Sequence, residues 1–128
     1  MVNPLKIYIS GPMSGLPEHN YPAFIQAEDC LRKAGYKHIV NPAKLGEKPS
    51  WQEYMKRDIQ LLCRCDCVAL LDGWGDSKGA RLEVQIAIAL GLRVETLDTW
   101  LARPAFQKKL RENPQGAAGL PGVQYETV

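Results

Sequence analysis

No apolar run in the sequence approaches the roughly 20 residues that a membrane span needs. The N-terminus enters a strand-like segment directly and lacks the pattern of a signal peptide. An excess of one charge is also lacking, because 16 basic and 14 acidic residues leave a formal charge of +2. That charge neither demands nor excludes a polyanionic partner. These absences indicate a cytoplasmic protein without a membrane partner.

Histidine is scarce, and the cysteines do not have the spacing of a metal site. Cys63, Cys65 and Cys67 form one close run, whereas zinc ligands usually come as two separated pairs or together with histidines. His19 and His38 are the only histidines, and neither has a ligand-like spacing to that run. The alternative is a helix end followed by a buried strand, in which cysteines act as small apolar side chains. We expect no metal site and, in the cytoplasm, no disulfide.

What is present is the composition of one ordinary globular domain, with 45% apolar and 23% charged residues in 128 positions. Strand-like and helix-like segments alternate along it. We expect strands at residues 5–10, 37–41, 67–71 and 92–97, and helices at 20–34, 50–64, 79–90 and 104–112. Gly35 can close the first helix in a left-handed conformation, and Ser50 with Glu53 forms a capping box that opens the second.

Alternating strands and helices imply parallel strands joined by right-handed crossovers. The sequence therefore predicts an α/β fold: a single flavodoxin-like or Rossmann-like open sheet of four to five mainly parallel strands, with helices on both faces. We expect the α/β nucleotide-binding domain to span residues 1–102, and residues 103–128 to form a C-terminal helix and an irregular tail. Ligands of such sheets bind at the carboxyl ends of the strands, here the loops 11–19, 41–49 and 72–78.

Asp58 is the residue that fits its helical pattern least well. At about 100° per residue it falls between Trp51, Met55 and Leu62, near the middle of the apolar face. A carboxylate buried there is costly unless it is paired or works at a site. Asp58 is therefore either a functional acid or one half of a structural salt bridge.

Glu83 lies about one turn into the helix that begins near Gly79. The positive end of the helix dipole there favours the ionised carboxylate. The residues after it, from Val84 to Leu90, are apolar almost all round, which predicts a buried helix with Glu83 at the strand-end cleft. The alternative is a carboxylate that only stabilises the helix terminus on a solvated face.

Three further side chains have two interpretations each. Ser77, in the Gly-rich loop before this helix, can bind a phosphate or cap the helix. Trp74, in the same loop, can stack on a base or pack against the protein. Tyr8, beside the first strand end, can offer its phenol as a hydrogen-bond donor or belong to the core.

Together these pieces resemble the nucleoside 2-deoxyribosyltransferase superfamily, which includes deoxynucleoside 5′-monophosphate N-glycosidases and uncharacterised phage proteins. The resemblance covers about residues 5 to 94. The segments that carry it are Tyr8-Ile9-Ser10-Gly11-Pro12, Asp58 before an apolar strand, and Ser77-x-Gly79-x-x-x-Glu83 followed by Ala89-Leu90-Gly91.

The resemblance implies that Glu83 is a nucleophile that attacks the anomeric carbon of a 2-deoxyribosyl group and expels the base. It implies that Tyr8 helps to place this nucleophile, and that Asp58 lies near the sugar and the base. The chemistry fits independently, because N-glycosidic cleavage passes through an oxocarbenium-like state that one ionised carboxylate can trap. A second acid, kept near neutrality by burial, can protonate the leaving base.

The resemblance also implies where the substrate binds. The transferases usually carry an aspartate at the position of Ser77, whereas the monophosphate N-glycosidases carry a serine that binds the 5′-phosphate. Asp76 is adjacent, and Arg81 stands where the superfamily often has a second glycine. The expected substrate-binding residues are Gly11, Pro12, Met13, Ser14, Trp74, Asp76, Ser77 and Gly79. In relatives a neighbouring subunit's C-terminal region completes the site, which implies a homodimer.

We therefore expect an enzyme that cleaves, or transfers across, the N-glycosidic bond of a (deoxy)nucleoside 5′-monophosphate without a metal or organic cofactor. The alternatives are a nucleoside 2-deoxyribosyltransferase and a non-catalytic nucleotide sensor on the same fold. A third alternative is a nucleic-acid-binding protein that uses the basic stretch from Arg103 to Arg111. Four basic residues on one short helix are usually a solvated face, so nucleic acid is not the partner we expect.

Overall fold

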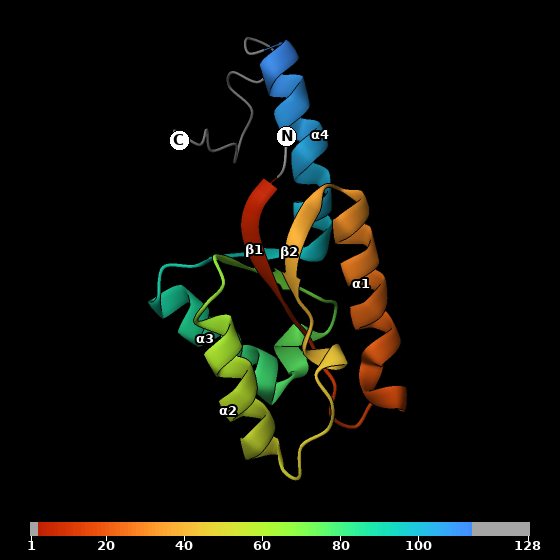
Figure 1. Ribbon diagram of the computed structural model, residues 1–128, viewed down its shortest axis with the longest axis vertical. Helices are drawn as coiled ribbons and strands as arrows, with labels where there is room; N and C mark the ends of the chain where they lie inside the picture. Colours follow the sequence, from red (N-terminus) through yellow and green to blue (C-terminus); the bar gives the residue numbers. More distant parts are fainter. Residues whose placement is uncertain (1–2, 114–128) are drawn as a thin grey trace.

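The computed structural model describes residues 3–113, in which four strands alternate with four α-helices (Figure 1). The strands are β1 (Asn3–Ser10), β2 (Tyr36–Val40), β3 (Cys67–Leu70) and β4 (Arg93–Thr96). The helices are α1 (Tyr21–Lys33), α2 (Trp51–Leu62), α3 (Lys78–Ala89) and α4 (Leu97–Glu112). Short 3₁₀ turns at Pro17–Asn20 (η1), Pro42–Lys44 (η2) and Trp74–Asp76 (η3) lie in the three loops that were expected to bind ligand.

The four strands form one parallel sheet in the order β2-β1-β3-β4. β2 lies on one side of β1, whereas β3 and then β4 lie on its other side. The direction in which the chain adds strands to the sheet therefore reverses after β2, and the switch point lies between β1 and β3. This is the order of the first four strands in flavodoxin-like sheets. The predicted α/β open sheet with helices on both faces is confirmed.

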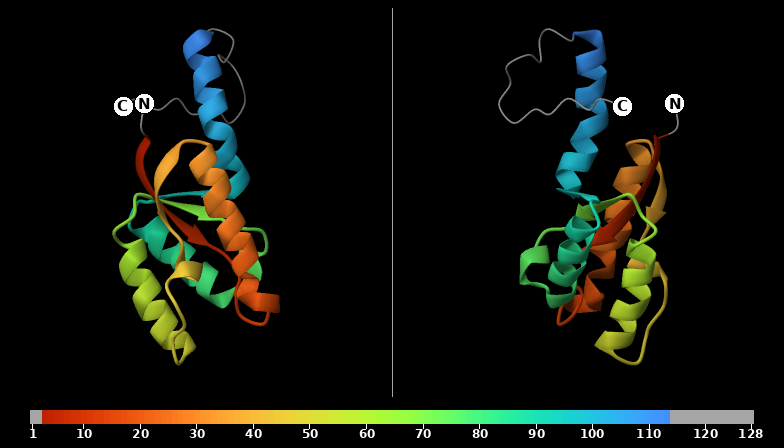
Figure 2. Two further views of the ribbon diagram at one scale, coloured as in Figure 1. Left: turned by 45° about the vertical axis from the view of Figure 1, so that its right-hand side comes forward. Right: turned by 90° about the vertical axis from the view of Figure 1, so that its left-hand side faces the viewer.

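The two faces of the sheet bury different helices because side chains alternate along each strand. Ile7 and Ile9 of β1 pack with α1 and with Trp100 of α4. Tyr8, between them, faces the opposite way and packs with α2 and α3. Figures 1 and 2 show the resulting layers, with the sheet between α1 and the α2–α3 pair. The central strands therefore carry apolar side chains on both faces, as buried parallel strands do.

Local sequence signals determine several helix ends. The Ser50 hydroxyl accepts from Glu53 N at 3.1 Å and opens α2, and Gly35 takes a φ of +104° after α1. The conformation of Gly35 and the Ser50 cap agree with the prediction. The second bond of the predicted capping box is not formed, because the Glu53 carboxylate accepts from Lys56 Nζ at 3.4 Å and not from Ser50 N. Ser77 accepts from Ala80 N at 3.2 Å, so its hydroxyl caps α3.

The C-terminal helix begins earlier than its sequence predicts. We expected a strand up to residue 97 and a helix from 104, but Thr96 caps α4, its hydroxyl accepting from Thr99 N at 3.2 Å. Pro104 lies inside this helix and has no N–H to offer to the carbonyl of Trp100. The Tyr36 hydroxyl donates to that carbonyl instead, at 2.8 Å. A tertiary contact thus satisfies the carbonyl that the internal proline leaves without its helical partner.

The far half of α4 projects beyond the sheet and away from the other helices (Figure 2). The predicted boundary between residues 102 and 103 falls inside this helix. The predicted irregular tail, from residue 114 onward, lies outside the described residues. Among the described helices, none is long and apolar enough to cross a membrane.

One expectation about α3 was wrong. Its buried side chains are Ala80, Glu83, Val84 and Ala87, whereas Ile88 and Leu90 are more than half exposed. The helix is therefore buried along one side only. Apolar residues therefore also occupy the exposed side of α3 near its C-terminal end, which is why its sequence resembles that of a fully buried helix.

Candidate active site

A cavity of about 320 Å³ opens at the carboxyl end of β1, between the N-terminal ends of α2 and α3 and the loop before α1. It lies beside the β1–β3 boundary where the winding reverses, the position at which open α/β sheets bind ligands. Eight of the predicted site residues line it: Tyr8, Gly11, Met13, Ser14, Asp58, Ser77, Gly79 and Glu83. The structure therefore gathers side chains from β1, α2 and α3 around one space.

Two hydrogen bonds hold the Glu83 side chain in the cavity. It lies one turn into α3 and is 5% exposed. Tyr8 Oη donates to its Oε2, and Ser10 Oγ donates to its Oε1 at 2.9 Å. Tyr8 and Ser10 are two residues apart in β1 and so share the face that packs on α3. Each carboxylate oxygen thus has one fixed donor, which orients the group inside the cavity.

The protonation of Glu83 differs from the expectation. The helix N-terminus was expected to favour the ionised form, but burial raises the pKa of Glu83 to about 7. The hydrogen bonds from Tyr8 and Ser10 oppose this rise, and the nearby Asp58 adds to it. Desolvation of the carboxylate is the largest cause of the shift. A carboxyl with a pKa near neutrality can act as a base or nucleophile and exchange its proton readily.

Asp58 is buried on the apolar face of α2, as predicted. It lines the cavity, and it also forms an ion pair with Arg57, whose Nε donates to Oδ1 at 2.9 Å. Burial raises the pKa of Asp58, and the bond to Arg57 acts against that rise. The site therefore holds two carboxyls with raised pKa values. A raised pKa was expected for Asp58 but not for Glu83.

Tyr8 serves the core and the site together. Its side chain is completely buried in the cluster between the sheet and α2–α3, while its hydroxyl bonds to Glu83. Burial, and then the charge of Glu83, raise the pKa of Tyr8 well above its usual value. The phenol therefore stays protonated and acts as a donor to the carboxylate.

Two glycines allow backbones to approach closely at the site. A Cβ on Gly11 would lie 2.8 Å from Leu71 Cβ, so the loop after β1 needs glycine to pass over the end of β3. A Cβ on Gly79 would lie 3.2 Å from Met55 Sδ and 3.6 Å from Trp51 Nε1. Gly79 thus lets the start of α3 lie against α2, which brings Ser77 to the cavity.

Three predicted binding residues, Pro12, Trp74 and Asp76, do not line the cavity. Trp74 packs half-buried against the cluster between the sheet and α2–α3, which favours its packing interpretation. Asp76 is exposed in η3, and Pro12 lies against Gly73. The 3₁₀ turn at Trp74–Asp76 directs this part of the loop away from the cavity.

Four aromatic side chains that were not predicted as site residues also line the cavity: His19, Tyr21, Trp51 and Tyr54. Trp51 and Tyr54 lie seven and four residues before Asp58, so helical periodicity could have placed them on the same side of α2. His19 carried no such signal. It lies in a segment where Glu18, His19 and Asn20 all have φ between 53° and 59°. Such left-handed runs of non-glycine residues are costly and persist only where surrounding contacts hold them.

The cysteine run is part of the core and the helix end. Cys63 ends α2 and is exposed, whereas Cys65 and Cys67 are buried. Burial raises the pKa of the Cys65 thiol to about 11 and that of Cys67 to about 12. Within residues 3–113 no group of three or more potential ligands is placed to hold a metal ion.

The raised pKa of Glu83 predicts how stability depends on pH. Between the unfolded pKa of 4.5 and the folded pKa of about 7, the folded state holds a proton that the unfolded state has lost. The free energy of unfolding therefore falls as the pH rises through this window, by about 3 kcal/mol from this group. Glu83→Gln removes the titration, so its stability relative to wild type should increase by that amount between pH 4 and pH 8. Urea unfolding at both pH values measures this, and a constant difference would contradict it.

Comparison with known proteins gives one finding about the family. A model of the family described as "Domain of unknown function (DUF4406)" matches residues 5–96, which include all but the first two residues of β1, the other three strands and the three helices between the strands. No curated protein matches the chain. Because the match spans well over half of the sequence and contains the whole cavity lining, the chain belongs to the DUF4406 family.

Proposed function

We propose that this protein cleaves the N-glycosidic bond of a (deoxy)nucleoside 5′-monophosphate, with Glu83 as the nucleophile. The observation that carries the proposal is the Glu83 carboxylate, held by Tyr8 and Ser10 inside a cavity that Asp58 also lines. The type of reaction is inferred from the resemblance to the nucleoside 2-deoxyribosyltransferase superfamily. The arrangement of the two carboxyls supports this inference. The expected cytoplasmic location and homodimer remain part of the proposal.

The two carboxyls share one proton, and the form that reacts is the one in which Glu83 is ionised and Asp58 holds the proton. Because the pKa of Glu83 is about 7, its ionised form is accessible at neutral pH. In the first step a Glu83 oxygen attacks C1′, the bond from C1′ to the base nitrogen breaks, and the base takes the bonding electrons. Asp58 gives its proton to the departing base. In the second step water attacks C1′, its proton returns to Asp58, and Glu83 leaves as a carboxylate. The products are the free base and the sugar 5-phosphate.

The remaining cavity wall suits the two ends of a nucleotide. His19, Tyr21, Trp51 and Tyr54 offer flat faces on which a base can stack. Among the described residues that line the cavity none is lysine or arginine. We therefore assign the phosphate to the N-terminal end of α3, which Ser77 caps. Helix N-termini attract anions even where no basic side chain is present.

Base release from a panel of nucleoside 5′-monophosphates and free nucleosides tests the proposal. We expect release from at least one monophosphate, and slower release from the matching nucleoside. Chromatography of the free base measures it, with and without a second base. Exchange of bases without net hydrolysis would indicate a transferase. Tight nucleotide binding with no release from any substrate would contradict the proposal and favour the non-catalytic sensor.

Ser77→Asp provides the control for phosphate recognition. Aspartate is as good a helix cap as serine, so α3 should keep its N-terminus. Its negative charge would repel a phosphate at that end of the helix. We expect the preference for monophosphate over nucleoside to disappear in this variant. An unchanged preference would mean that the phosphate binds elsewhere.

A further inference from the structure

The Arg57 side chain contacts three different parts of the site at once. Its Nε donates to Asp58 Oδ1 at 2.9 Å, and its Nη1 donates to the carbonyls of Leu45 at 3.1 Å and Gly46 at 2.7 Å. The guanidinium also lies over the Tyr54 ring, 5.4 Å from its centroid. The Arg57 side chain is only 17% exposed. One side chain therefore links a cavity carboxylate, a loop and an aromatic wall.

This pairing does not follow from the helix. Consecutive residues of a helix point about 100° apart and do not face each other. Arg57 reaches its neighbour because its side chain is long and its planar fork offers several donors at once. The same fork holds the turn at Leu45 and Gly46. The position of the Asp58 carboxylate is thus tied to that turn as well as to α2.

We propose that Arg57 is a positioning residue for Asp58, fixing Oδ1 so that Oδ2 is presented to the substrate and stabilising the carboxylate that remains after proton transfer. This inference rests on the proposed function, in which Asp58 protonates the leaving base. Oδ2 has no hydrogen-bond partner among the described residues, so it is the oxygen available to the substrate.

The electrostatic setting makes such a partner necessary. A carboxylate in a side chain only 10% exposed is unstable unless it is paired. The groups around it are Glu83 from α3, Tyr8 from β1, and His19, Tyr21 and Tyr54, which line the same cavity. Of these, Glu83 carries the same sign when ionised and disfavours a second negative charge. Arg57 supplies the charge-assisted bond that offsets this repulsion.

Titration of the two carboxyls tests the proposal without any substrate. Carboxyl carbon NMR of wild type, Arg57→Gln and Arg57→Lys would follow Asp58 and Glu83 from pH 4 to 9. In Arg57→Gln the pKa of Asp58 should rise further, and that of Glu83 should fall because Asp58 is ionised less often. Arg57→Lys keeps the positive charge, so the pKa values of Asp58 and Glu83 in this variant should lie between those of wild type and those of Arg57→Gln. Unchanged pKa values in both variants would overturn the proposal.

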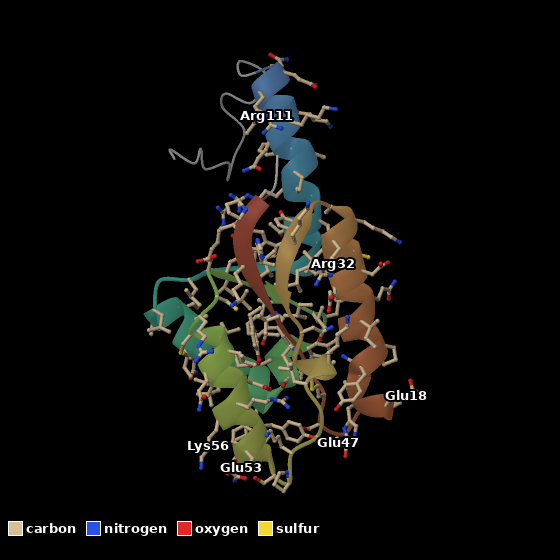
Figure 3. The ribbon with its side chains drawn as sticks, in the orientation of Figure 1. Glu18, Arg32, Glu47, Glu53, Lys56 and Arg111 are labelled. Carbon is tan, nitrogen blue, oxygen red and sulfur yellow. The ribbon has the colours of Figure 1, made fainter. Side chains whose placement is uncertain are left out.

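Turnover separates positioning from a structural role. Arg57→Gln should lower kcat by about 10- to 100-fold and change KM by less than about 3-fold, because the lost contact acts mainly on the transition state. Arg57→Lys should recover part of kcat, since one ammonium cannot hold the carboxylate and both carbonyls together. The matched control is Lys56→Gln, on the same helix but exposed and pointing away from the body (Figure 3), which should match wild type.

The outcomes distinguish this inference from the proposed function. If wild type releases no base while the titrations shift as expected, the proposed function fails and the coupling of Arg57 to Asp58 stands. If wild type releases base while Arg57→Gln keeps wild-type kcat and pKa values, the reaction stands and the role of Arg57 is refuted. Circular dichroism of each variant confirms folding, and Arg57→Lys decides the result if Arg57→Gln does not fold.

Discussion

Glu83→Gln is expected to lower base release by about 10⁴-fold or more while the protein stays folded. The amide keeps the size of the carboxylate. Its oxygen can accept from one of the two hydroxyls that hold Glu83, those of Tyr8 and Ser10, and its NH2 group can donate to the oxygen of the other. It cannot act as an anionic nucleophile toward C1′. The loss should therefore appear in kcat with substrate binding largely retained. Single-turnover assays with a saturating monophosphate measure it.

The control for this variant is Glu47→Gln, which changes an exposed glutamate at the surface (Figure 3) and should leave turnover unchanged. Wild-type turnover in Glu83→Gln would end the nucleophile assignment. The same substitution is expected to stabilise the fold above pH 7, because it removes a buried carboxylate. Loss of activity together with gain of stability is typical of a side chain kept for function at a cost to folding.

Trp100→Ala is expected to lower the free energy of unfolding by about 3–5 kcal/mol. The Trp100 side chain is 1% exposed in the cluster between the sheet and α1, and its ring meets Tyr36 edge-on. Its Nε1 donates to the carbonyl of Val68 at 2.8 Å, so the substitution creates a cavity and also removes a buried donor. Urea unfolding followed by circular dichroism measures the change.

The matched control is Phe106→Ala on the exposed, projecting half of α4, which should change stability by only about 0.5 kcal/mol. Trp100→Phe separates the two causes, because it keeps most of the apolar volume and loses the donor to Val68. Equal stabilities of Trp100→Ala and Phe106→Ala would contradict the view that the start of α4 belongs to the core.

The sequence by itself determined the order of strands and helices and the fold class. Those features depend on local spacing: apolar runs mark the buried strands, and Ser50 and Gly35 mark helix ends wherever the chain goes. It also placed Asp58 on the inner face of α2, because helical periodicity is local. Glu83 was expected at the cleft because the apolar residues after it predicted a buried helix. The helix is buried on one side only, and Glu83 lies on that side.

Only the tertiary structure decided the state and the surroundings of these groups. The pKa of Glu83 depends on its burial in the folded protein. The pairing of Asp58 with Arg57 depends on the turn at Leu45 and Gly46, whose carbonyls accept from the same guanidinium. Likewise, Trp74 lies outside the cavity and α4 continues through Pro104 because of contacts with distant parts of the chain. Burial and hydrogen bonding between residues far apart in sequence leave no periodic signal, which is why spacing alone could not predict them.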